Sequence, residues 1–126
     1  MVITQKRSKR KASGGRYGSS TSKKLHQAGN RPAEPRVATR KIKTLRTIGG
    51  KSKNILMSDE FINVTDPATK KTSKVKMTNV LENTANKQYI RMNVLTKGAV
   101  VETEKGKAKI TNRPAQEGYV TGVLVK

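Results

Sequence analysis

The first 36 residues contain too few apolar side chains to build a core of their own. Only eight of them belong to the apolar set, and Met1, Val2 and Ile3 are three of those. Holding a backbone in one conformation costs entropy, which the burial of apolar surface has to offset. Eight apolar residues, three of them alanines, cannot do this for 36 positions. We therefore expect residues 1–36 to be disordered in the free protein and to be ordered by a partner.

The charge of the chain is large and unevenly distributed. The net charge is +20, and residues 1–53 carry 16 Lys and Arg against one acidic residue, whereas residues 54–126 carry 12 against seven. A protein with this charge repels itself and attracts polyanions. The cations that we predict to contact a polyanion run from the N-terminus onto the first strand, in a series that also contains Lys43: Lys6, Arg7, Lys9, Arg10, Lys11, Arg16, Lys23, Lys24, Arg31, Arg36, Arg40, Lys41, Arg46, Lys51 and Lys53.

The motif GGRYG, which begins at Gly14, has several interpretations. A KH-type loop would have to join two helices, and a P-loop would need a preceding strand and a final GK[ST], and neither pattern surrounds this motif. A flexible linker is a further alternative. We favour a phosphate contact, because Gly14 and Gly15 let the chain pass close to another backbone and expose N–H groups to phosphate oxygens, Arg16 supplies a planar cation and Tyr17 can stack on a base.

The basic run alone also fits a localisation signal or a transit peptide. A transit peptide is amphipathic, however, and this run lacks an apolar side. No helix-turn-helix, zinc finger, basic zipper or RNP signature is visible, so the contact is expected to be mostly cation to phosphate. An extended basic arm suits the irregular grooves of folded RNA better than a uniform duplex.

Other classes of function find little support in the sequence. His26 is the single histidine and has no partner at a catalytic spacing, and Glu102 and Glu104 each have a lysine opposite in the hairpin predicted below. The chain has no cysteine, no cluster with metal-ligand spacing and no apolar run long enough to span a bilayer. We expect no enzyme activity, no cofactor, no metal, no small-molecule substrate and no membrane partner.

Residues 37–126 hold 33 of the 41 apolar residues, many of them β-branched. Short strands are predicted at 37–48, 55–64, 75–81 and 119–126, with a turn at Asp66 and one helical turn within 86–93. The spacing of Ile42, Leu45 and Ile48 also fits a helix. A barrel or a sandwich is favoured over a helical fold. We predict an all-β domain at 37–126, a small closed or partly open β-barrel of about six strands with one short helix. A long basic extension without regular structure precedes it at 1–36.

Residues 98–111 give the clearest local signal, a β-hairpin. A two-residue turn at Lys105 and Gly106 would place Glu104 opposite Lys107 and Glu102 opposite Lys109. One face of this hairpin would then carry two pairs of opposite charge, and the other would be apolar or small.

Three stretches resemble one known family: KRKASGGR, NVTDPATKK and NVLENTANKQYIRMNVLTKGAVVETEKGKAKITNRPAQEG. They are similar to the small-subunit ribosomal protein family "eight, eukaryotic-type" of archaea and eukaryotes, over nearly the whole chain and in its short archaeal form. The resemblance implies a β-barrel on small-subunit ribosomal RNA with a basic arm threaded into the RNA. The RNA contacts that it implies are Lys9, Arg10, Lys11, Gly14, Gly15 and Arg16 in the arm, and Arg91, Asn93, Lys97 and Arg113 in the domain.

The leading hypothesis is therefore a structural ribosomal protein that neutralises phosphates and stabilises folded RNA. Its expected partners are small-subunit ribosomal RNA and neighbouring ribosomal proteins, and we expect one copy in a cytoplasmic particle. A ribosome-assembly factor with a similar domain and a general DNA-coating protein are the alternatives.

Overall fold

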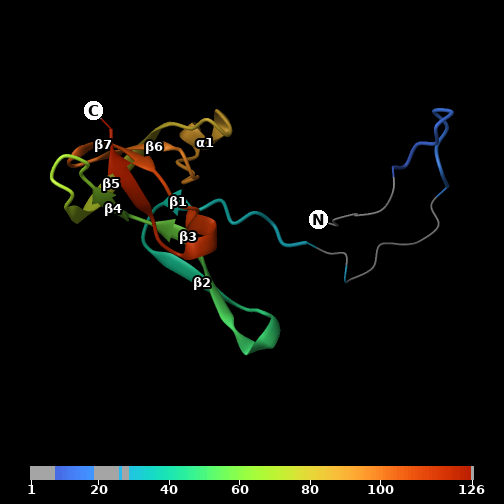
Figure 1. The fold of residues 1–126 in the computed structure, drawn as a ribbon, viewed down its shortest axis with the longest axis horizontal. Coiled ribbons are helices and arrows are strands. Elements are labelled where there is room, and N and C mark those ends of the chain that lie inside the picture. Colours follow the sequence, from blue (N-terminus) through green and yellow to red (C-terminus); the bar gives the residue numbers. More distant parts are fainter. Residues whose placement is uncertain (1–7, 19–25, 27–28, 126) are drawn as a thin grey trace. The chain divides into compact units, whose positions relative to one another are not determined.

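The computed structural model describes residues 8–18, 26 and 29–125 (Figure 1). The chain divides into two compact units, Met1–Pro32 and Ala33–Lys126. The second unit contains, in chain order, β1 (Arg36–Val37), β2 (Lys41–Arg46), a 3-10 turn (Ile48–Gly50), β3 (Ser52–Asp59), β4 (Phe61–Thr65), β5 (Thr72–Glu82), α1 (Gln88–Arg91), β6 (Val100–Thr103), β7 (Gly106–Ile110), α2 (Pro114–Glu117) and β8 (Thr121–Leu124).

Strands β4 to β8 form a closed barrel, in the order β4-β5-β6-β7-β8. The barrel closes through a parallel pairing of β4 with β8, and its other neighbours are antiparallel. Successive side chains of a strand point to opposite faces, and the apolar residues follow this alternation. Ile62 and Val64 of β4, and Ala108 and Ile110 of β7, are buried. The predicted all-β barrel is confirmed.

A close approach of β8 to its neighbours depends on Gly122. A Cβ atom at this position would lie 2.9 Å from the Cδ1 atom of Ile62 and 2.9 Å from the backbone oxygen of Lys109. Real Cβ contacts are not this short, so a side chain at Gly122 would push β8 away from β4 and β7. The glycine therefore helps to close the barrel around its buried core.

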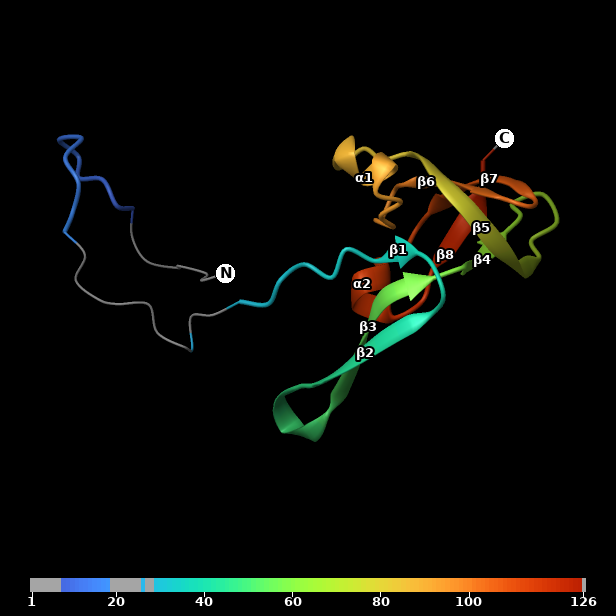
Figure 2. The same ribbon diagram turned by 180° about the vertical axis from the view of Figure 1, so that it is seen from behind.

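A second sheet of three strands has the order β1-β3-β2, with β1 parallel and β2 antiparallel to β3. The predicted strand at 37–48 is present as β2, and residues 41–46 are not helical. The β2–β3 hairpin extends away from the barrel in both ribbon views (Figures 1 and 2). Helix α2 packs against β3 of this hairpin, where the position of a Cβ on Gly118 lies 3.1 Å from Cβ of Asn54.

The prediction of one strand over 55–64 is wrong, because the chain changes sheet at Glu60. Residues up to Asp59 belong to β3, and residues from Phe61 belong to β4 of the barrel. The buried carboxylate of Asp59 accepts a hydrogen bond from the backbone N–H of Phe61 at 3.1 Å, which stabilises this corner. Strand-forming residues on both sides of the corner concealed it. The strands therefore divide between a five-stranded barrel and a separate sheet.

The β6–β7 hairpin exists, but its predicted register is wrong by two residues. Glu102 lies opposite Lys107, and Thr103 lies opposite Gly106. The two turn residues are Glu104 and Lys105, and the hydroxyl of Thr103 donates to the backbone oxygen of Gly106 at 2.7 Å. A shift of two residues keeps every side chain on its predicted face. The apolar face was therefore correct, but neither predicted charge pair lies directly across the strands, and Glu102 faces Lys107 instead.

The turn at Asp66 and the helical turn within 86–93 are both present. Asp66 accepts hydrogen bonds from the backbone N–H of Ala68 at 3.0 Å and the hydroxyl of Thr69 at 2.9 Å. Helix α1 lies within the predicted turn. Helix α2 was not predicted, although Pro114 at its start and Gly118, with φ 80°, after its end are typical helix boundaries. No helix in the described part of the chain is long and apolar enough to cross a membrane.

Candidate nucleic-acid interface

A tight turn within residues 8–18 collects the predicted contacts of the first unit. Arg10 and Arg16 form an antiparallel bridge. Inside it, the backbone N–H of Lys11 donates to Gly15 at 2.7 Å, and that of Gly14 donates to Lys11 at 3.0 Å. Every residue from 8 to 18 is exposed. The predicted contact residues that share this turn are Lys9, Arg10, Lys11, Gly14, Gly15, Arg16 and Tyr17.

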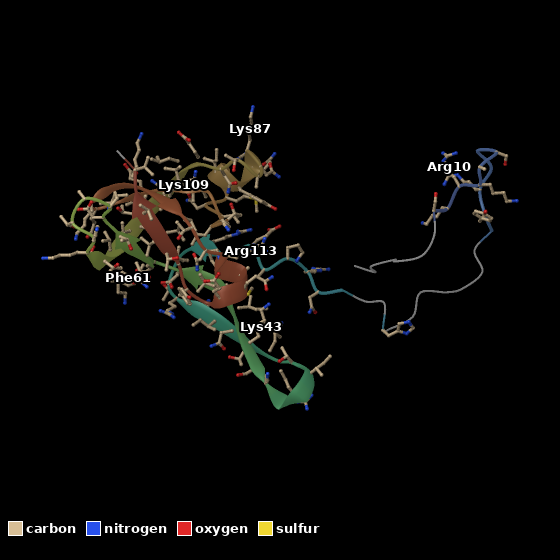
Figure 3. The ribbon with its side chains drawn as sticks, viewed as in Figure 1. Arg10, Lys43, Phe61, Lys87, Lys109 and Arg113 are labelled. Carbon is tan, nitrogen blue, oxygen red and sulfur yellow. The ribbon has the colours of Figure 1, made fainter. Side chains whose placement is uncertain are left out.

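The side chains of this turn combine cations with one ring. The ammonium of Lys11 lies 5.5 Å from the centroid of the Tyr17 ring, and Tyr17 is 39% exposed. The guanidinium of Arg10 donates to the backbone oxygen of Gly14 at 3.2 Å, which helps to shape the turn (Figure 3 labels Arg10). A ring beside an ammonium group, on a turn that also carries arginines, is a suitable surface for a nucleotide.

Of the other predicted contacts in the first unit, the structure describes only Arg31. Arg31 is exposed. Four predicted contacts lie outside the described residues: Lys6, Arg7, Lys23 and Lys24.

Backbone pairing in the second unit brings Arg36 beside residues that lie far along the chain. Arg36 forms an antiparallel bridge with Val94, and the backbone N–H of Val37 donates to the oxygen of Asn93 at 3.2 Å. Arg91 and Lys97 flank this paired segment and are exposed, as is Arg36. The structure therefore unites predicted contacts that are more than fifty residues apart in the sequence.

Asn93 has a structural role that the sequence did not indicate. Its φ of 52° lies in the left-handed region, which asparagine tolerates better than most residues. Its side-chain oxygen accepts a hydrogen bond from the backbone N–H of Val80 at 3.1 Å, where the register of β5 with β6 is irregular. The predicted RNA contact of Asn93 stays a prediction.

The carboxylate of Glu117 interacts with the backbone of Arg113 and with the charge of Lys97. The carboxylate accepts hydrogen bonds from the side chain of Asn112 at 3.2 Å and from the backbone N–H of Arg113 at 3.3 Å. These contacts, that of Asn112 first, hold the pKa of Glu117 below its ordinary value, and the charge of Lys97 acts in the same direction. Arg113 itself is exposed beside α2 (Figure 3).

The β2–β3 hairpin presents the densest positive charge of the second unit. Residues 40–53 include six Lys and Arg and no acidic residue. All of β2 is exposed except the half-buried Leu45. Figure 3 shows Lys43 on this hairpin, away from the barrel. The cations that the hairpin brings together are Arg40, Lys41, Lys43, Arg46, Lys51 and Lys53.

Two of these cations also have partners inside the protein. The guanidinium of Arg40 lies 3.8 Å from the carboxylate of Asp59, whose side chain is only 3% exposed. The ammonium of Lys53 donates to the side-chain oxygen of Gln116 in α2. The contact of Lys53 therefore attaches the hairpin to α2, and that of Arg40 joins the two ends of the hairpin, in addition to the contact predicted for each residue.

One exposed pair on the barrel was missed by the sequence predictions. The ammonium of Lys74 lies 4.4 Å from the centroid of the Phe61 ring, and Phe61 is 39% exposed (Figure 3). Both residues occupy outward positions of β4 and β5. The alternation of buried and exposed residues in these strands could have placed them there.

Acidic residues and the histidine form no cluster in the part that the structure describes. His26 is exposed, and no group of three or more His, Cys, Asp or Glu in this part could hold a metal ion. Glu102 lies opposite Lys107, as a cross-strand pair.

Comparison with known proteins gives a consistent result. A family model described as "Ribosomal protein S8e" matches residues 4–125. A protein of Methanocella arvoryzae, named small ribosomal subunit protein eS8, is 50% identical over 121 residues, which is 96% of this chain and 97% of that protein. The protein of the same name from Methanocorpusculum labreanum is 45% identical over 125 residues, 99% of this chain and 100% of its own length. The one from Nanoarchaeum equitans is 47% identical over 104 residues, 82% of each chain.

Proposed function

Because the chain belongs to the ribosomal protein S8e family, we propose that it is a structural constituent of the small ribosomal subunit that binds folded ribosomal RNA by neutralising phosphates. The family resemblance seen in the sequence is confirmed by the match over residues 4–125. The chain is a ribosomal protein and not an enzyme, and its place of action is the ribosome in the cytoplasm.

The observation that carries the RNA-binding proposal is the unbalanced charge of the β2–β3 hairpin. Residues 40–53 include six Lys and Arg, and this segment contains no acidic residue that could balance their charge. Such a concentration of like charge on an exposed hairpin raises the free energy of the isolated protein, and polyanionic phosphates lower it again. Basic side chains that release counterions from phosphates supply much of the affinity of a protein for nucleic acid.

Three groups of cations would share this contact. The first is the turn at residues 9–17, the second is the group Arg36, Arg91, Lys97 and Arg113, and the third is the β2–β3 hairpin. Contacts of this kind fix the position of a protein on RNA and read little of its sequence. The exposed rings of Tyr17 and Phe61 offer stacking surfaces beside the cations.

The segment predicted to be disordered when free, residues 1–36 without the four residues 33–36 that belong to the second unit, would take its bound conformation from the RNA. The scarcity of apolar residues in this segment supports the proposal, because internal burial cannot offset the entropy of ordering it. NMR spectra of the free protein would test it. Narrow random-coil signals are expected for residues 1–32 and dispersed signals for residues 33–126, because β1 and the residues before it pair within the second unit. Dispersed, protected signals throughout would contradict the proposal.

Within the subunit the chain would act as a single copy beside neighbouring ribosomal proteins. The test is mass spectrometry of small subunits purified from the source organism, before and after washing with salt. The chain should be present in translating subunits and should be depleted as the salt concentration rises, because phosphate contacts weaken with salt. Its absence from mature subunits, or its full retention at molar salt, would contradict the proposal.

A further inference from the structure

The outermost turn of the β2–β3 hairpin, residues 46–51, exposes an apolar side chain. Ile48 is 98% exposed, so it contributes almost no packing to the second unit. The turn itself is closed, because the backbone N–H and the hydroxyl of Thr47 both donate to the oxygen of Lys51, at 2.7 and 3.0 Å. Ile48 is therefore held outward by a hydrogen-bonded turn.

Two glycines follow Ile48 and keep the turn narrow. Gly49 and Gly50 have φ values of 78° and 75°, in the region that other residues rarely adopt. A Cβ atom at either position would meet no atom of the described residues within 4 Å, so this side of the turn is open in the part of the chain that the structure describes. Single exposed apolar residues are common on proteins. This one differs because it stands at the end of a projecting hairpin beside bare backbone.

The charges around Ile48 define the chemistry of its partner. Arg46 ends β2, Lys51 follows the glycines, and both are exposed. Lys43 and Lys53 lie further along the two strands, and residues 40–53 include no acidic residue. A partner that fits this turn would accept one aliphatic side chain and would carry negative charges on either side of it.

We infer that residues 46–51 dock into the minor groove of a double-stranded RNA segment, with Ile48 packed against riboses. The minor groove of an RNA helix is wide and shallow and displays riboses and 2′-hydroxyls, whereas the major groove is deep and narrow. A turn with one large apolar side chain and two glycines fits the shallow groove. Arg46 and Lys51 then reach the phosphates that border it. This inference rests on the proposed function and names the form of RNA that the hairpin recognises.

Directed cleavage of RNA tests the location of the turn. The chain has no cysteine, so Ile48→Cys provides a single thiol for an iron chelate that releases hydroxyl radicals. The full-length variant is assembled into small subunits, with Ala68→Cys on the exposed β4–β5 turn as the matched control. Cleavage from position 48 should affect both strands of one RNA helix with a 3′ stagger, as expected across a minor groove. A 5′ stagger, cleavage of single-stranded RNA only, or no RNA cleavage would overturn the inference.

Affinity measurements test the contribution of the side chain. The probe is an RNA duplex of about 16 base pairs, the length that a double-stranded-RNA-binding domain spans, beside a DNA duplex of the same sequence. Ile48→Ala should weaken binding to the RNA about tenfold, since it removes buried methylene groups, and should affect DNA less. Val125→Ala, at another exposed β-branched residue (45% exposed), is the control and should have little effect. The melting temperature should stay unchanged in both variants.

The outcomes separate this inference from the proposed function. Unchanged RNA affinity of Ile48→Ala, in a chain whose binding still falls steeply with salt, would overturn the inference alone. Weaker incorporation into subunits with unchanged affinity for RNA would show that Ile48 contacts a protein, and would also overturn it. Binding of the unaltered chain that does not respond to salt would contradict the proposed function itself.

Discussion

The barrel and the β2–β3 hairpin use similar strands for different purposes. In the barrel, apolar residues alternate with polar ones, and Ile62 is fully buried. In the hairpin, β2 is exposed on both faces, and Ile48 at its outer turn is 98% exposed. An isoleucine in the first region stabilises the fold, whereas an isoleucine in the second is available to a partner. Stability and RNA affinity should therefore respond to different substitutions.

The two regions also differ in how their charges are balanced. In the barrel, Glu102 lies opposite Lys107. The ammonium of Lys76 in β5 lies 3.9 Å from the carboxylate of Glu60, which directly precedes β4. The segment 40–53 has no acidic residue of its own, and Arg40 takes its partner, Asp59, from the end of β3. The hairpin thus carries charge that the protein itself leaves largely uncompensated, which is what a phosphate-binding element requires.

The largest expected effect comes from shortening matched isoleucines in the two regions. Ile62→Ala should lower the free energy of unfolding by about 2–5 kcal/mol, because it leaves a cavity in the core. Ile48→Ala should change it by less than about 0.5 kcal/mol. Urea denaturation of both variants measures the difference, and equal destabilisation would show that the turn packs against something in the free protein.

A smaller loss of stability is expected from Gly122→Ala. The new Cβ would collide with Ile62 and with the backbone of β7, and overpacking of this kind costs about 1–3 kcal/mol. Thermal melting is the measurement, and Gly49→Ala in the hairpin turn is the comparison. Gly49 has free space but a positive φ, so its variant should lose less. A neutral Gly122→Ala would mean that the barrel can relax at β8.

Removal of hairpin cations should affect binding and leave stability intact. The triple variant Lys43→Gln, Arg46→Gln, Lys51→Gln should bind small-subunit RNA at least about tenfold more weakly, and its salt slope should fall by about 2–3. The control carries the same loss of charge on exposed barrel positions, as Lys70→Gln, Lys71→Gln, Lys109→Gln. Equal losses in the two variants would show that net charge matters and that the hairpin has no special role.

The smallest expected effect is a pH dependence at Glu117. Hydrogen bonds from Asn112 and the backbone of Arg113 lower the pKa of its carboxyl in the folded state. The ionised group therefore adds stability at pH values above the ordinary glutamate pKa, and this contribution is lost as the pH falls through the lowered value. Glu117→Gln should melt slightly below the unaltered protein at neutral pH, and the difference should disappear as the pH falls below the ordinary glutamate pKa and through the lowered value. A difference that grows at acidic pH would contradict this assignment.

Much of the fold followed from periodicity and turn residues. The alternation in β4 and β7, the turn at Asp66 and the helical turn at α1 are all properties of local sequence. The corner at Glu60 was missed, because residues on both sides of it suit strands and only tertiary contacts divide them between two sheets. The register of the β6–β7 hairpin was missed because two turn positions preserve the same faces, and the bond from Thr103 to Gly106 selects one of them.

The sequence predicted which cations belong to the candidate interface, but it did not predict how the fold places them relative to one another. Counting charges identified the basic residues from Arg36 to Lys53. It could not show that backbone pairing places Arg36 beside the segment around Val94, nor that Asn93 supports β5. The sequence placed Ile48 at the end of a predicted strand and could not show that it is exposed. The exposure of a side chain at a hairpin turn depends on whether other parts of the fold pack against that turn.

The most direct test of phosphate neutralisation is a salt titration of the unaltered, full-length chain against small-subunit ribosomal RNA. The logarithm of the binding constant should fall linearly with the logarithm of the salt concentration. For about 6–10 phosphate contacts, the affinity should drop by roughly 10³–10⁵ between 50 and 200 mM salt, by analogy with duplex DNA. An affinity that stays nearly constant over this range would contradict the account.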